Sequence, residues 1–111
     1  MYAFEIPNQR FSLPAAAEIE RCRFVSVNAN SAGIPATADT QVIGVSMNKV
    51  AVDQVLEIAD GLVVVEAGAA ITAGAAVYAD AEGKAAAAGT NVAGIAITGA
   101  SGAGELITVK I

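Results

Sequence analysis

Short apolar segments separated by glycine are the feature that most restricts how this chain folds. The 11 glycines interrupt the apolar sequence again and again, and no long uninterrupted helical pattern remains. Val and Ile, which are stiff at the first side-chain torsion and favour strands, dominate the large apolar residues. Several short strand-like segments with turn residues between them are typical of barrels and sandwiches. The sequence therefore predicts a small all-β domain.

The expected secondary structure follows from these segments. Asp60-Gly61, between the strand-like segments QVLEI and LVVVE, predicts a tight hairpin. Residues 15–21 predict either a short helix after Pro14 or a continuing strand, residues 29–40 predict a loop, and residues 67–74 an apolar corner. The expected strands lie within residues 22–28, 41–47, 54–58, 62–66, 77–80, 84–88, 92–98 and 106–111. We therefore expect an antiparallel β-barrel with at most one or two short helical turns.

Two segments of the chain resemble each other. VIGVS at residues 42–46 and VAGIA at residues 92–96 each place a glycine among apolar residues, and a strand-like segment follows each of them. The residues are common ones and the spacing is loose. This weak repeat fits two related hairpins on opposite sides of one barrel.

The first 14 residues differ in character from the rest and predict an extended N-terminal arm, which leaves residues 15–111 as a single barrel domain. Tyr2, Phe4 and Ile6 alternate as in a strand with one apolar face, and Phe11 and Leu13 continue the apolar character. Arg and aromatic residues are enriched at protein interfaces, and Arg10 lies in the same segment. The arm packs either on a neighbouring protein or, as an edge strand, on its own barrel.

Composition excludes several classes of chemistry. The chain has no His, so Ser-His-Asp catalysis and His-containing zinc sites are excluded, and its single Cys22 rules out an internal disulfide framework. The carboxylates are scattered singly, and the glycine cluster at residues 99–104 lacks the order of a phosphate-binding loop. We expect no catalytic residues, no metal site and no cofactor.

Charge and hydropathy bear on the partners. A net charge of −5 argues against binding to nucleic acid. Residues 85–104 carry no charge over 20 residues, but Gly, Thr, Asn and Ser among them make a membrane span unfavourable. Lys49, in Met47-Asn48-Lys49-Val50, partly resembles the attachment lysine of biotinyl and lipoyl carrier domains. A carrier function that uses Lys49 is therefore one alternative.

Residues 41–111 carry a series of motifs in a fixed order: the IGVS segment, the Asp-Gly pair, EAGAAITAGAAVYADAEGK, NVAGIAIT and the final LITVKI. This order resembles that of the short Ala/Gly/Val-rich capsid decoration, or cement, proteins of tailed bacteriophages. The chain departs from the expected pattern where Gly74-Ala75 replaces Gly-Asp ahead of the Val-Tyr strand.

The resemblance implies a small β-barrel of the β-tulip type that binds and stabilises the outer surface of a phage capsid, without catalysis. Its implied partners are the major capsid protein and further copies of itself, as a trimer rather than a dimer, with no nucleic acid and no membrane. The implied location is the outer capsid surface of the virion, after synthesis in the host cytoplasm. A second alternative is an adhesive β-module of a surface fibre. In the arm, the residues expected to contact a subunit or the capsid are Tyr2, Phe4, Ile6, Arg10, Phe11 and Leu13.

Overall fold

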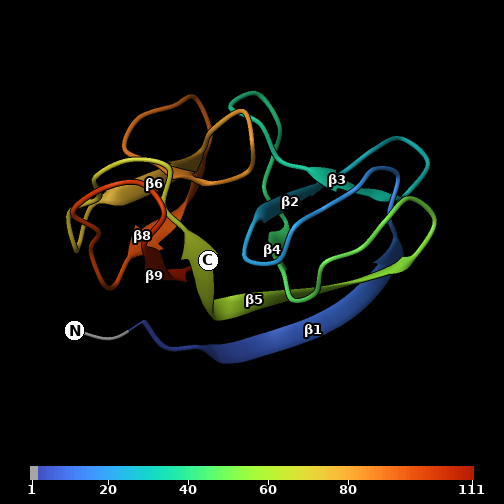
Figure 1. Ribbon diagram of the computed structural model, residues 1–111, viewed down its shortest axis with the longest axis horizontal. Helices are drawn as coiled ribbons and strands as arrows, with labels where there is room; N and C mark the ends of the chain where they lie inside the picture. The colour runs from blue at the N-terminus through green and yellow to red at the C-terminus, as the bar shows by residue number, and fades with distance from the viewer. Residues whose placement is uncertain (1–2) are drawn as a thin grey trace.

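The chain folds into one antiparallel sheet that curves around two small cores (Figure 1). The computed structural model describes residues 3–111, and no helix occurs among them. The sheet order is β3-β2-β4-β5-β9-β8-β6-β7, and β1 also pairs with β5. The strands are β1 (Ile6–Pro14), β2 (Phe24–Val27), β3 (Gly33–Pro35), β4 (Gly44–Ser46), β5 (Val55–Glu66), β6 (Ala76–Ala79), β7 (Ala85–Ala86), β8 (Val92–Ala96) and β9 (Leu106–Lys110). The all-β prediction is confirmed.

The hairpin predicted at Asp60-Gly61 is wrong, because β5 runs through both residues as one long strand. Its first part pairs with β4 and β1, and its last part, from Leu62 onward, pairs with β9. Gly61 has a φ of 94°, which glycine adopts without a steric penalty. Opposite it, the register of β1 shifts between Pro7 and Gln9. The glycine therefore lets the strand pass from one part of the sheet to the other instead of reversing it.

Residues 15–21, expected as helix or strand, and the apolar corner at residues 67–74 both form isolated bridges. Ile19 and Val50 exchange two backbone hydrogen bonds of 3.0 Å, and Ile71 and Ala100 exchange two of 2.9 Å. Ala15 and Ile19 are buried, so tertiary packing overrides the helical propensity of the alanine run at residues 15–17. The loop expected at residues 29–40 contains the short strand β3.

The two parts of the chain repeat the same pattern of strand pairing. Phe24–Val45 and Val25–Gly44 pair β2 with β4, and Ala76–Ile95 and Val77–Gly94 pair β6 with β8 in the same way. The bridges Ala15–Gly33 and Ile19–Val50 recur as Ala67–Ala85 and Ile71–Ala100, and β1–β5 pairing recurs as β5–β9 pairing. We call residues 9–60 the N-terminal half and residues 61–111 the C-terminal half. The repeat indicated by VIGVS and VAGIA is thus part of a pattern of strand pairing that covers almost the whole chain.

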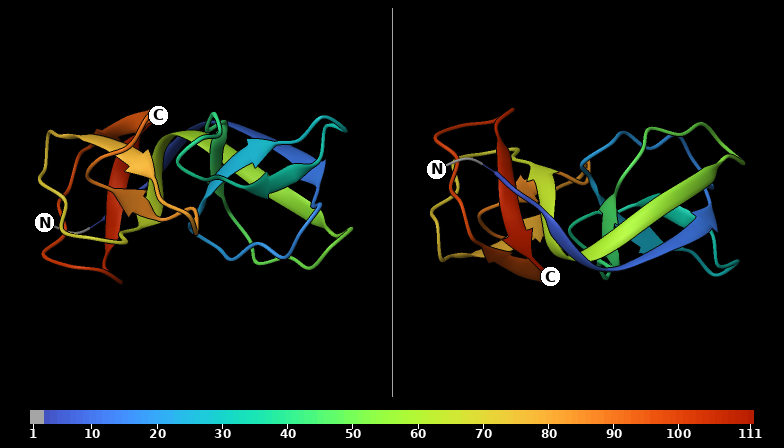
Figure 2. Two further views of the ribbon diagram at one scale, coloured as in Figure 1. Left: turned by 90° about the horizontal axis from the view of Figure 1, so that it is seen from above. Right: turned by 90° about the horizontal axis from the view of Figure 1, so that it is seen from below.

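Turns and cores repeat as well. The side-chain Oδ1 of Asn28 accepts hydrogen bonds from the backbone N–H groups of Asn30 and Ala32, and Oδ1 of Asp80 accepts from those of Glu82 and Lys84. The N-terminal core contains Ala15, Ile19, Val25, Val50, Leu56 and Ile58, and their equivalents Ala67, Ile71, Val77, Ala100, Ile107 and Val109 belong to the larger core. Figures 1 and 2 show the halves as two lobes, with β1 and β5 running along both.

Candidate interaction surface

The predicted contact residues of the N-terminal arm fall into two groups. Within the chain, residues 6–14 pair with β5, which is the edge-strand alternative that the sequence left open. Phe11 and Leu13 are half-buried and pack against the N-terminal core. Phe4, Ile6 and Arg10 are exposed, and Tyr2 lies outside the described residues. The alternation along β1 therefore separates residues that hold the strand to its own sheet from residues that face outward.

The exposed start of the arm is held in place by its backbone. The N–H of Phe4 donates to Thr108 Oγ1, and the Thr108 hydroxyl donates to the Phe4 carbonyl. Thr108 is buried, and its own N–H donates to Thr98 Oγ1 at 2.9 Å. Phe4 is nevertheless 39% exposed and Ile6 63% exposed. This segment thus presents two large apolar side chains from a backbone that is bonded to the sheet.

Further exposed apolar side chains continue this surface across the sheet. Ile6 pairs with Leu62, Leu62 pairs with Lys110, and Lys110 pairs with Ile95. Paired residues of antiparallel strands lie on the same face of the sheet, so these four form one row. Ile95 is 42% exposed, and Val92 on the same strand 51%. The row therefore combines apolar area with one cation.

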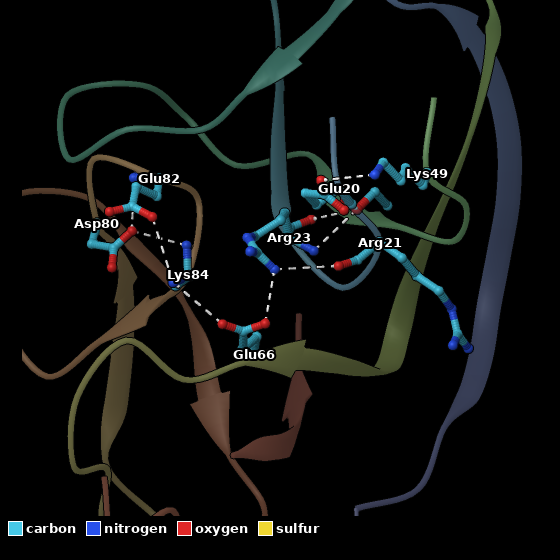
Figure 3. A network of polar contacts seen from close by, with 9 residues as sticks. Glu20, Arg21, Arg23, Lys49, Glu66, Asp80, Glu82 and Lys84 are labelled. Atoms are coloured by element: carbon cyan, nitrogen blue, oxygen red, sulfur yellow. Dashed lines mark hydrogen bonds and ion pairs between the residues drawn. The ribbon is translucent and has the colours of Figure 1, made fainter. Parts of the chain in front are cut away.

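A polar network joins the two halves (Figure 3). Arg23 Nη1 lies 3.1 Å from Glu66 Oε1, and Lys84 Nζ lies 3.3 Å from Glu66 Oε2 and 3.4 Å from Glu82 Oε2. The pKa of Lys84 is raised, chiefly by its hydrogen bond to Glu66 and next by the charge of Glu82. Arg23 also links the network to β4, because its backbone N–H donates to Ser46 Oγ at 3.0 Å. Its charges are paired within the chain, which indicates a structural clamp.

Two further residues bear on function. Cys22 is buried, and burial raises the pKa of its thiol above the ordinary value of 9.0, so it is a poor nucleophile at neutral pH. Lys49 follows β4 with an exposed side chain, whose Nζ lies 3.3 Å from Glu20 Oε1. No cluster of potential metal ligands occurs in residues 3–111. No helix in that range has the length and apolar character needed to cross a membrane.

The described residues form a small all-β protein with several large apolar side chains exposed on its strands. A family model described as phage cement protein matches residues 6–111. The chain therefore belongs to the phage cement proteins, a family of structural phage capsid proteins. This result confirms the family resemblance and extends it to β1, which the sequence motifs did not cover.

A solved structure supports the fold. The N base of head fiber gp8.5 from bacteriophage phi29 has a similar structure, with a TM-score of 0.76 and 20% sequence identity. The alignment covers 93% of this chain and 92% of that chain. Comparison with curated proteins finds none that matches. At this identity the likeness establishes the shared architecture.

Proposed function

We propose that this protein binds the outer surface of a phage capsid and stabilises the shell through contacts with the major capsid protein and with further copies of itself, as a trimer rather than a dimer. The observation that carries the proposal is the exposed N-terminal segment, hydrogen-bonded to β9, of a chain that belongs to the cement family. Phe4 and Ile6 are its anchors, and Arg10 supplies a cation on the outer side of β1.

The geometry favours binding because little has to be ordered on contact. Both backbone polar groups of Phe4 are already bonded to Thr108. A preorganised surface loses less conformational entropy when it binds. Full burial of a Phe or Ile side chain contributes roughly 1.5–3 kcal/mol, so one copy makes a modest contact. Many copies on one lattice then add up to a stable coat.

The proposed action is binding alone, without catalysis. The one cysteine is buried with a raised pKa, and the chain has no histidine that would activate a nucleophile. The polar network that includes Arg23 and Glu66 is paired internally. These features leave the exposed apolar surface as the functional part of the molecule.

The test is co-sedimentation with capsids that lack the protein. Ile6→Glu should weaken capsid binding by tenfold or more, about 1.4 kcal/mol per decade, because the carboxylate loses hydration on contact. Val52→Glu is the control, since Val52 is 55% exposed and Ile6 63%. Unchanged affinity of the Ile6→Glu protein for capsids would refute the proposed contact. The test uses point substitutions because deleting the arm would also remove Phe11 and Leu13, which pack on the N-terminal core.

A second candidate is the base of a head fibre, which the likeness to the phi29 head fiber N base favours. Such a base also binds a capsid, so the two candidates share the proposed surface. Electron microscopy of decorated particles separates them. A low knob at each site supports a cement role, and a projecting rod attached to the knob supports a fibre base.

A further inference from the structure

One face of the N-terminal half is buried by the C-terminal half. Phe24, Val42, Val45 and Ala59 form this covered face, and each is at most 8% exposed. The C-terminal half supplies the turn at residues 80–84 and the end of β5. The Phe24 N–H donates to the Gly83 carbonyl at 2.7 Å, and the Glu66 N–H donates to the Cys22 carbonyl at 2.9 Å.

The equivalent face of the C-terminal half is open. It consists of Ala76, Val92, Ile95 and Lys110, which we call the distal face. Strand pairing establishes the equivalence, since Phe24–Val45–Ala59 and Ala76–Ile95–Lys110 are matching cross-strand rows. Val45 is fully buried, whereas Ile95 is 42% exposed. The halves are therefore stacked head to tail, which leaves one face uncovered at the C-terminal end of the stack.

The opposite end of the stack has an unused covering turn. The turn at residues 28–32 has the same hydrogen bonds as the turn at residues 80–84. Ser31 has the left-handed conformation of Gly83, with φ values of 61° and 78°. Val27, beside this turn, is 40% exposed, whereas its equivalent Ala79 is 2% exposed. The covering element of the N-terminal half thus lies at the surface.

We propose that the distal face of one copy is covered by the turn at residues 28–32 and the adjoining end of β1 of a second copy, in the arrangement that joins the two halves of each chain. The inference rests on the self-association included in the proposed function and names its two surfaces. Such a contact is heterologous, because it joins two different surfaces. Repeated contacts of this kind form a closed ring or an open chain of copies, depending on the rotation between one copy and the next.

The charges fit a contact between copies. Inside the chain, the junction carries the ionic group of Arg23, Glu66 and Lys84. The equivalent positions at the junction between copies are Ala75, Pro14 and Ala32. All three are uncharged, so the contact leaves no member of the ionic group without its partner. An unpaired charge would otherwise oppose association, and Lys110, the charge on the distal face itself, has a stem long enough to keep its ammonium group in water.

Two residue differences between equivalent positions make the contact between copies weaker than the contact within the chain. A Cβ on Gly83 would lie 2.9 Å from the Phe24 carbonyl oxygen, and Ser31 carries a Cβ at the equivalent position. Pro14 has no N–H, so the bond that Glu66 makes to Cys22 has no counterpart. The association is therefore reversible in solution, and the high local concentration on a capsid strengthens it.

A disulfide trap tests the contact. The Cβ built on Gly83 lies 3.4 Å from Arg23 Cβ, and the equivalent residues between copies are Ser31 and Ala75. Disulfides join Cβ atoms about 3.5–4.5 Å apart. Ser31→Cys and Ala75→Cys proteins, purified separately with a mass tag on one, should form the mixed disulfide under mild oxidation without capsids. Val52→Cys replaces Ser31→Cys in the control, because Val52 is 55% exposed and lies outside both surfaces.

A second set of variants tests the same contact without relying on the trap alone. Ile95→Glu in the Ala75→Cys protein should abolish the mixed disulfide, whereas Val52→Glu should leave it intact. Ser31→Gly should increase association in sedimentation velocity, because it removes the crowded Cβ. A mixed disulfide no more abundant than in the control overturns the inference. Loss of capsid binding on Ile95→Glu without any mixed disulfide also overturns it, since the capsid then covers the distal face and the proposed function stands.

Discussion

The two halves of this protein build one strand pattern from different side chains. At some positions the N-terminal half has a charged residue where the C-terminal half has a small uncharged one, as with Arg23 and Ala75 or Lys49 and Gly99. At others the reverse holds, as with Ala32 and Lys84 or Ala59 and Lys110. It also holds Cys22, Ser31 and Asp53 in the left-handed region of φ, where the C-terminal half has Gly74, Gly83 and Gly104. The backbone hydrogen bonds, rather than any particular side chain, therefore define the repeated unit.

The difference in burial is larger than the difference in sequence. Phe24 is fully buried between the halves, and its equivalent Ala76 is on the open distal face. Val45 and Ile95 are both large and β-branched, yet only Val45 is covered. A residue's energetic role is thus decided by its place in the stack.

The largest expected effect is at the junction of the halves. Phe24→Ala should lower the free energy of unfolding by about 3–5 kcal/mol, the usual cost of truncating a buried Phe. Urea denaturation followed by circular dichroism measures this change. Ile95→Ala, on the equivalent face of the C-terminal half, should change stability far less because Ile95 is already partly in water. Equal losses in the two variants would contradict the head-to-tail stack.

The ionic clamp between the halves should contribute less. Glu66→Gln should cost about 1–2 kcal/mol, between the values of exposed and buried ion pairs, because Glu66 contacts both Arg23 and Lys84. Thermal denaturation at low and high salt checks this value. Glu82→Gln is the control, since its side chain is 74% exposed. A loss of stability for Glu82→Gln that matches Glu66→Gln would show that the clamp contributes nothing specific.

Much of the fold is predictable from local pattern. The strand-like segments within residues 22–28, 41–47, 92–98 and 106–111 contain β2, β4, β8 and β9, and the segment within residues 77–80 overlaps β6. The sequence around Asp60-Gly61 does not distinguish a hairpin from a continuous bent strand, because both use a glycine with positive φ. Which of them forms depends on β1 and β9, which are distant in sequence and pair with β5.

The candidate surface is predictable only in part, for a related reason. Alternation along residues 1–14 predicts a strand with one apolar face, but the register shift between Pro7 and Gln9 decides which side chains face the core. Phe11 and Leu13 consequently pack inward, and Ile6 remains exposed. The distal face cannot be predicted from the sequence, since Val42 and Val92 occupy matching motifs. Only the stacking of the halves makes Val42 buried and Val92 exposed.

Backbone conformation gives a smaller contrast between the halves. Gly74→Ala should destabilise the protein by about 1 kcal/mol, because an L side chain at a φ of 88° is strained although its Cβ meets no neighbouring atom. Chemical denaturation measures the change. Gly102→Ala is the matched control, since its Cβ also meets open space and its φ lies outside the left-handed region. A neutral Gly74→Ala would show that the C-terminal half tolerates a side chain here as the N-terminal half tolerates Cys22.

The smallest expected effect is a difference in acid sensitivity at one repeated turn. Gln54 Oε1 accepts a hydrogen bond from the Ala51 N–H at 2.8 Å, and in the C-terminal half Glu105 Oε2 accepts from the Ser101 N–H at 3.1 Å and from the Ser101 hydroxyl. The bond from the Ser101 hydroxyl, followed by the backbone bond, lowers the pKa of Glu105 below its ordinary value of 4.5. The carboxylate therefore stabilises the fold fully above pH 4.5, and this contribution is lost as the pH falls through the lowered pKa.

Replacing Glu105 with Gln should remove that pH dependence and give the C-terminal turn the chemistry of its N-terminal equivalent. The stability difference between the natural protein and Glu105→Gln, followed by thermal melting at a series of acidic pH values, should shrink as the pH falls. Gln54→Glu is the reciprocal variant and should introduce a weaker dependence of the same sign, because Ala51 offers its N–H but no hydroxyl. A stability difference that is constant across the acidic range would mean that the Ser101–Glu105 bond does not favour the charged form, and that the two turns are equivalent in energy although the C-terminal one is a residue longer.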